Sequence, residues 1–198
     1  MIDNKYAVAV VGCGGMGGGH AIAISSGTGN AVWNTDDSVG VAWEGNMNTD
    51  ISKKLTLAGV YDIDPKRQEW AAERGFYNYE SFEAILSDEK VDIVLIATPN
   101  HLHKDMAIAS MRAGKHVLCE KPVTPSSAEL EEILKVSKET GKVFYPRQNR
   151  RWDEDFLIIK KIYEEKLLGE VFNIECRVMG SRGIPGDWRR DPNRGGGM

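Results

Sequence analysis

The chain has 198 residues, 41% hydrophobic and 27% charged, a composition typical of a soluble globular protein with one sizeable core. Its formal net charge of −4 provides no global positive field, so we expect no nucleic-acid or anionic-membrane partner. No apolar run approaches the roughly 18 residues of a membrane-spanning helix, and no signal-peptide pattern begins the chain, so we expect a cytoplasmic protein.

Apolar runs and amphipathic stretches alternate up to about residue 145. The apolar runs predict buried strands over 6–11, 55–61, 91–97, 116–119 and 142–145. Between them the pattern favours helices that begin within 12–20, at Asp64-Pro65, at Ser81, near Leu102 and at the Ser126/Glu129 pair. From about 27 to 54 the pattern breaks into Gly, Asn, Asp and Thr, which predicts an insertion that holds a hairpin.

This alternation predicts an α/β fold in which a parallel sheet has helices on both faces. Right-handed crossovers make it a doubly wound Rossmann sheet, whose ligand crevice lies at the carboxyl ends of the strands. We place this dinucleotide-binding domain at 1–148. The remaining residues, 149–198, contain a predicted helix after Asp153 and a half-buried strand over Val171 to Met179. We interpret them as the beginning of a second, incomplete α+β domain for substrate binding and oligomerisation.

Neither the cysteines nor the arginines of the sequence predict a metal site or a nucleic-acid surface. Cys13, Cys119 and Cys176 are widely spaced and match no zinc-ligand pattern, so we expect free thiols in a reducing compartment and no metal. The arginines between 147 and 194 are interspersed with carboxylates, which favours a mixed, solvated surface over a nucleic-acid patch.

The segment from Gly12 to Gly17 fits the G-x-G-x-x-G pattern of dinucleotide-binding loops, and it follows a predicted strand and opens a helix as that pattern requires. Gly12 permits the tight turn, Gly14 lets the backbone approach a pyrophosphate, and Gly17 lets the helix pack close to the sheet. Gly15 and Met16 open the helix, whose N-terminal N–H groups favour phosphates. The alternative is a glycine turn that only joins strand to helix.

An acidic residue at the end of the second strand completes this pattern, and Asp62 stands there, displaced along the sequence by the insertion. A carboxylate at this place accepts hydrogen bonds from a ribose diol and repels a 2′-phosphate, which favours NAD over NADP. Lys66 and Arg67 lie nearby and weaken that preference, so NADP stays possible. The alternative is that Asp62 only begins a helix, a role that Asp64 fills equally well.

The stretch from Ala97 to Val123 resembles the Gfo/Idh/MocA oxidoreductase family, which includes glucose-fructose oxidoreductase and inositol dehydrogenase. The resemblance covers nearly the whole chain except the insertion, and each short motif is weaker than the combination. The matching motifs are Thr98-Pro99-Asn100 with His103, Gly114-Lys115-His116-Val117, Glu120-Lys121-Pro122, His20 after the glycine loop, Asn149-Arg150-Arg151 and Trp188-Arg189.

The resemblance implies roles for these residues. Thr98, Pro99, Asn100 and His103 would border the nicotinamide side of an NAD site, and Glu120 and Lys121 would lie beside the nicotinamide ribose. Lys121 would reach the substrate, and Pro122 would shape the turn, with a cis peptide bond as one option. His101 and His103 have an alternative interpretation as residues that only begin a helix.

Lys121 is the candidate catalytic residue. Hydride transfer from an alcohol carbon needs a group that takes the hydroxyl proton, and a lysine in a closed pocket beside a cationic nicotinamide can be neutral often enough to act as that base. The alternative is a solvated lysine in a turn beside a paired Glu120.

Family members carry a helix with an aspartate and a histidine after the run seen here as Gly195-Gly196-Gly197. Both residues would lie beyond Met198. The resemblance therefore implies a chain truncated at its C-terminus, which lacks the complete active site and most of the second domain's sheet. A full-length protein of this kind is expected to be a homo-oligomer.

Three functional hypotheses follow. The leading one is an NAD(P)-dependent oxidoreductase that transfers a hydride between nicotinamide and a sugar, an inositol or a related polyol. The alternatives are an NAD-dependent glycosidase, which would show no net NADH, and a non-catalytic dinucleotide-binding module, which would bind NAD without turnover.

Overall fold

The structure is a computed structural model that describes residues 2–27, 53–177 and 191–194. Its centre is a five-stranded parallel sheet in the order β2-β1-β3-β4-β5. The strands are β1 (Tyr6–Val11), β2 (Leu55–Tyr61), β3 (Ile93–Ile96), β4 (His116–Cys119) and β5 (Phe144–Pro146). The chain leaves β1 toward β2, then crosses back to β3 on the other side of β1, so the crevice of the sheet lies at the carboxyl ends of β1 and β3.

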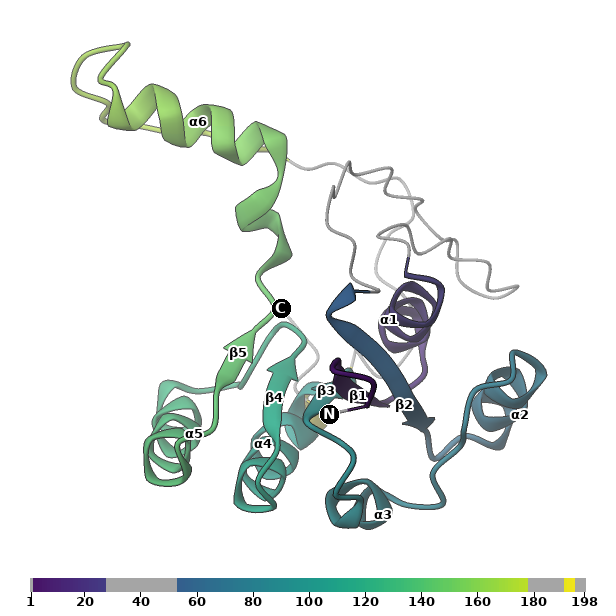
Figure 1. Cartoon of the computed structure of the whole chain (residues 1–198). Helices are drawn as coiled ribbons and strands as arrows, with labels where there is room; N and C mark the ends of the chain where they lie inside the picture. Colours follow the sequence, from purple (N-terminus) through teal and green to yellow (C-terminus); the bar gives the residue numbers. More distant parts are fainter. Residues whose placement is uncertain (1, 28–52, 178–190, 195–198) are drawn as a thin grey trace.

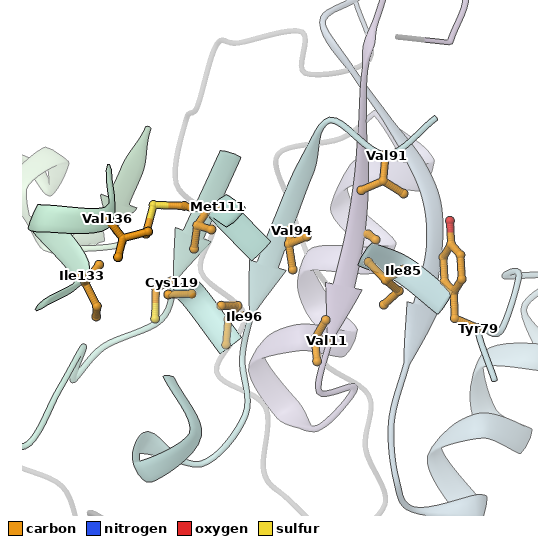
Figure 2. Close-up of a cluster of buried hydrophobic side chains, with 13 residues drawn as sticks. Val11, Tyr79, Ile85, Val91, Val94, Ile96, Met111, Cys119, Ile133 and Val136 are labelled. Carbon is orange, nitrogen blue, oxygen red and sulfur yellow. The ribbon is translucent and has the colours of Figure 1, made fainter. Parts of the chain in front are cut away.

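Helices cover both faces of the sheet, as the alternation predicted (Figure 1). On one face, Val8 and Val10 of β1 pack with Ala21 of α1 and Ala71 of α2. On the other face, Figure 2 shows Val11 in a row of buried side chains that α3, α4 and α5 help to cover. These helices are α1 (Gly15–Ser26), α2 (Pro65–Glu73), α3 (Phe82–Ser87), α4 (His103–Arg112) and α5 (Ser127–Thr140). Side chains alternate across the sheet, and the central strands β1 and β3 are buried on both faces, as a doubly wound fold requires.

Three of the predicted helix starts are confirmed by side-chain capping contacts. Asp64 accepts a hydrogen bond from the Lys66 backbone N–H at the start of α2, with Pro65 in the first helical position. Ser81 and Ser126 accept backbone N–H groups at the starts of α3 and α5 in the same way. Each cap satisfies an N–H group that has no partner within its own helix.

Beyond residue 148 the chain leaves the sheet through η3 (Asn149–Trp152) and α6 (Glu154–Glu164), which extends away from the other helices in Figure 1. Its apolar side chains, such as Phe156, Ile158 and Tyr163, stay exposed. The predicted strand over Val171 to Met179 is wrong for 171–177, which are irregular. A strand needs a neighbour to satisfy its backbone groups, and no described strand pairs with this segment.

Several predictions fall on residues that the structure does not describe. The interior of the expected insertion, 28–52, lies outside the described residues, as do Trp188-Arg189 and the run from Gly195 to Gly197. The described part resumes at η5 (Pro192–Arg194), where the Arg194 carbonyl oxygen lies 3.3 Å from His101 Nδ1. The assignment of 149–198 to a second domain stays a prediction.

Candidate functional site

The glycine loop after β1 has the backbone that its sequence predicted. Gly12 has φ of +88°, a conformation that side chains disfavour, and a Cβ there would lie 2.8 Å from the carbonyl oxygen of Ala97. A Cβ at Gly17 would overlap the carbonyl oxygen of Gly12. Both positions therefore require glycine, because the turn and the first part of α1 press against the ends of β1 and β3.

Gly14 is different, because a Cβ at this residue would meet nothing within 4 Å. It is the N-cap of α1, no side chain caps the helix, and no acidic residue occupies the first turn, which Gly15 and Met16 begin. The space beside Gly14 is therefore open at the positive end of a helix whose first turn carries no acidic residue. This bare backbone fits a diphosphate group.

Asp62 lies beside this loop at the end of β2. Its Oδ2 accepts a hydrogen bond of 2.6 Å from the Cys13 backbone N–H, and its Oδ1 accepts one of 2.9 Å from the Asp64 backbone N–H. Since Asp64 is the N-cap of α2, Asp62 is not the helix-capping residue that the alternative proposed. The carboxylate instead ties the glycine loop to the end of β2.

The cysteines near the site are buried thiols. Burial, together with the Asp62 carboxylate, raises the pKa of Cys13 to about 12, and burial beside Glu120 raises that of Cys119 to about 12. Both thiols stay protonated at neutral pH, so neither is a ready nucleophile.

The buried side chain of His103 contacts the backbone of the loop after β3. This residue begins α4 and is only 1% exposed. Its Nε2 lies 2.9 Å from the Thr98 carbonyl oxygen, and its Nδ1 lies 3.0 Å from that of Pro122. His103 therefore links the loop after β3 to the turn after β4. Asn100, which lies between Thr98 and His103 in the sequence, begins η2 (Asn100–Leu102) and is buried.

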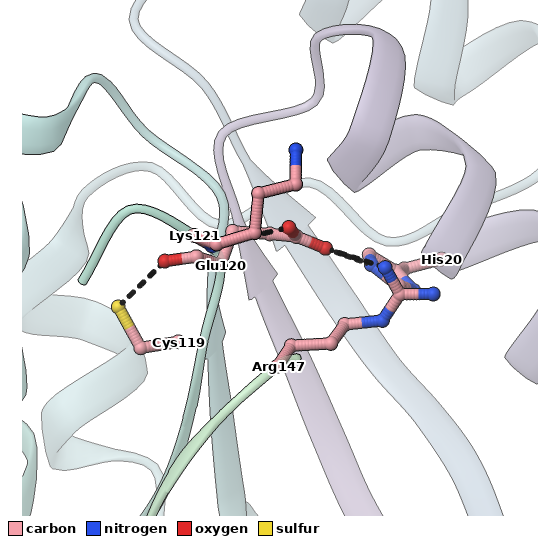
Figure 3. A network of polar contacts seen from close by, with 5 residues as sticks. All are labelled: His20, Cys119, Glu120, Lys121 and Arg147. Carbon is pink, nitrogen blue, oxygen red and sulfur yellow. Dashed lines mark hydrogen bonds and ion pairs between the residues drawn. The ribbon is translucent and has the colours of Figure 1, made fainter. Parts of the chain in front are cut away.

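The turn after β4 contains Glu120, Lys121 and Pro122, with a cis peptide bond before the proline. The side chain of Glu120 is 5% exposed, and its Oε1 lies 2.8 Å from His20 Nε2 and 2.9 Å from Arg147 Nη1 (Figure 3). The three residues Glu120, His20 and Arg147 are called the Glu120 cluster below. Lys121 is exposed, and its side chain points away from the cluster. No ion pair joins its ammonium group to any residue in the described ranges.

Charge in the Glu120 cluster follows from burial and contacts. Burial alone would raise the pKa of Glu120, but the hydrogen bond from His20 and the Arg147 guanidinium outweigh it and hold the pKa below its ordinary value. Burial lowers the pKa of His20 despite the hydrogen bond to Glu120. At neutral pH the cluster therefore contains an ionised carboxylate, a guanidinium and a neutral imidazole that donates its Nε2–H.

The lowered pKa of His20 predicts that acid weakens the fold. Unfolded His20 binds a proton as the pH falls below 6.5, whereas folded His20 takes up its proton only at lower pH, so the free energy of unfolding falls as the pH falls between the two pKa values. His20→Gln keeps a donor for Glu120 but cannot titrate, so denaturant unfolding measured at a series of pH values should show a shallower decline. His101→Gln, at an exposed histidine, is the control. Parallel declines for wild type and His20→Gln would contradict this account.

Only part of this cluster was predictable from the amino-acid sequence. His20 entered through the family resemblance and Glu120 through its motif, but no role was predicted for Arg147. The available signal was its place directly after β5, since the carboxyl ends of parallel strands meet at one edge of the sheet.

Among the described residues, no group of three or more His, Cys, Asp or Glu side chains is arranged to hold a metal ion. No helix in the described ranges is long and apolar enough to cross a membrane.

Comparisons with known proteins agree with this architecture. The model of the GFO_IDH_MocA family, described as an oxidoreductase family with an NAD-binding Rossmann fold, matches residues 6–148. The crystal structure of an NAD-binding protein from Listeria innocua superposes with a TM-score of 0.80 at 47% identity, covering 98% of this chain and 50% of that one.

Two curated enzymes are also similar. Levoglucosan dehydrogenase of Pseudarthrobacter phenanthrenivorans is 35% identical over 136 residues, which are 68% of this chain and 33% of that enzyme. The scyllo-inositol 2-dehydrogenase (NADP(+)) of Bacillus subtilis is 39% identical over 89 residues, 45% of this chain and 25% of that enzyme. The chain thus spans a third or less of the length of these two enzymes.

Proposed function

Because this chain belongs to the Gfo/Idh/MocA oxidoreductase family and carries an NAD-binding Rossmann domain, we propose that it transfers a hydride between a nicotinamide dinucleotide and a sugar, an inositol or a related polyol. One observation carries the proposal. Three features lie at the carboxyl edge of one sheet: the glycine loop with open space at Gly14, the Asp62 carboxylate at the end of β2, and the exposed Lys121 in the turn after β4. The similar enzymes act on levoglucosan and scyllo-inositol, both polyhydroxy compounds.

The residues of this edge fit a dinucleotide. The backbone of Gly14, Gly15 and Met16 would hold the diphosphate, and Asp62 would accept hydrogen bonds from the adenosine ribose. Since β3 and β4 lie on the opposite side of β1 from β2, the nicotinamide half belongs on their side. Thr98, Pro99, Asn100 and Glu120 would border it there, with His103 holding the two loops from behind.

Lys121 would act as the acid–base group. When bound, the nicotinamide accepts a hydride from an alcohol carbon or returns it to a carbonyl carbon. During oxidation the Lys121 amine takes the proton of the substrate hydroxyl, and during reduction its ammonium gives that proton back to the carbonyl oxygen. The exposure of Lys121 and the direction of its side chain away from Glu120 leave it accessible to a substrate.

The proposal is tested by titrating the chain with NADH and with NADPH, and then by screening polyols and sugars with the full-length protein and NAD for the formation of NADH. We expect binding of at least one nucleotide and NADH formation with a polyol. Absence of binding to both nucleotides would contradict the proposal. Product formation without net NADH would favour a glycosidase, and binding without turnover would favour a non-catalytic module.

Asp62 provides a sharper test of cofactor choice. Asp62→Asn removes the charge that repels a 2′-phosphate and keeps an oxygen for the Cys13 N–H, so the preference for NADH over NADPH should fall by about tenfold. Fluorescence titration of both nucleotides measures this ratio. Asp64→Asn, at the N-cap of α2, is the matched control and should leave the ratio unchanged. An unchanged ratio in Asp62→Asn would remove Asp62 from the ribose site.

Two further expectations stay predictions. Assembly of the protein into homo-oligomers can be checked by light scattering coupled to size-exclusion chromatography. A cytoplasmic location can be checked by cell fractionation.

A further inference from the structure

The Glu120 cluster joins three separate parts of the chain at one oxygen atom. Oε1 of Glu120 contacts His20, from within α1, and Arg147, which follows β5. The Arg147 backbone is fixed as well, because its N–H donates a hydrogen bond of 2.8 Å to the Cys119 carbonyl oxygen. The Arg147 side chain, 23% exposed, therefore reaches its partner from an ordered position.

The cluster continues directly into the turn that carries Lys121. The Lys121 backbone N–H donates a hydrogen bond of 3.3 Å to the second carboxylate oxygen of Glu120, so the side chain of Glu120 contacts the turn directly. His103 contacts the same turn at the Pro122 carbonyl oxygen. The orientation of Lys121 thus depends on how firmly the Glu120 carboxylate is held.

The geometry points to a new role for Arg147, and we propose that it is a positioning residue. Acting through Glu120, it fixes the Lys121 turn on the nicotinamide side of the cofactor site. This inference rests on the proposed function, because it places Lys121 beside a nicotinamide.

The buried negative charge of Glu120 explains why its partner at position 147 is an arginine. A buried carboxylate needs a partner of opposite charge, and His20 is neutral at this site. Without Arg147 the Glu120 carboxylate either takes up a proton or rotates toward solvent. Either change loosens the contact with the Lys121 turn, whereas Asp62 follows β2, on the other side of β1, and its carboxylate contacts the Cys13 and Asp64 backbone instead.

The two halves of the cofactor make the inference testable by binding alone. NADH reaches both halves, whereas ADP lacks the nicotinamide and its ribose and probes only the glycine loop and Asp62. Arg147→Met should weaken NADH binding by about tenfold and change ADP binding by less than about twofold. Arg147→Lys keeps the charge and should recover most of the NADH affinity. Arg150→Met, which removes an exposed arginine that pairs with Asp153, should bind both ligands like wild type.

Thermal unfolding of each variant is measured first, because an unpaired Glu120 destabilises the fold. If Arg147→Met fails to fold, Glu120→Gln combined with Arg147→Met removes the buried charge, and it should fold and still bind NADH weakly but ADP normally. Equal losses of NADH and ADP affinity, wild-type NADH affinity in Arg147→Met, or wild-type NADH affinity in the double variant would overturn the inference. Wild-type protein that binds neither ligand would instead contradict the proposed function on which the inference rests.

Discussion

Gly14→Val is expected to lose NADH affinity by about a hundredfold or more while the melting temperature stays close to that of wild type. The reason is the open space at this residue, where a Cβ would meet no protein atom within 4 Å. The backbone dihedrals of Gly14, φ −65° and ψ −165°, are extended and lie outside the left-handed region that favours glycine. The valine side chain would therefore fill only the space that the diphosphate needs. Isothermal titration calorimetry with NADH and a thermal melt measure the two quantities.

Gly17→Ala is the matched contrast within the same loop. A single Cβ at Gly17 overlaps the Gly12 carbonyl oxygen, so α1 must move away from the sheet and the melting temperature should fall. Wild-type NADH affinity in Gly14→Val would show that the cofactor lies elsewhere. A large fall in melting temperature in Gly14→Val would show that the space above the loop is filled by protein.

Lys121→Met should lower turnover by about a hundredfold to ten-thousandfold, the usual contribution of a general acid–base group. Methionine keeps a similar length and apolar stem but has no amine to take the proton of the substrate hydroxyl. NADH affinity and stability should stay near wild type, because Lys121 is exposed and forms no ion pair within the described part of the chain. Steady-state rates of NADH formation, with the polyol identified by the screen, measure the effect.

The control for Lys121→Met is Lys135→Met, which removes an exposed lysine of α5 whose partner is Glu139 one helical turn away. This variant should turn over like wild type. Unchanged turnover in Lys121→Met would remove Lys121 from the mechanism. Loss of NADH binding together with turnover would indicate that Lys121 holds the cofactor rather than moving a proton.

The strands and helix starts were predictable because their signals are local. The run from Tyr6 to Val11 is apolar throughout, as a strand buried on both faces requires, and Asp64, Ser81 and Ser126 each cap a helix within a few residues of their own backbone. The predicted strand over Val171 to Met179 was wrong for its described part because alternation signals a strand only where a neighbouring strand exists to pair with it.

The sequence by itself determined the family, the doubly wound sheet and the backbone of the glycine loop. Positions such as Gly12 and Gly17 tolerate no side chain, so the residue type itself records that requirement. Only the tertiary structure decided what surrounds Glu120. His20 and Arg147 stand 100 and 27 positions away from it, and no local pattern pairs residues at such separations. The register of β4 and β5 and the packing of α1 bring them to one buried carboxylate, whose charge then requires the arginine.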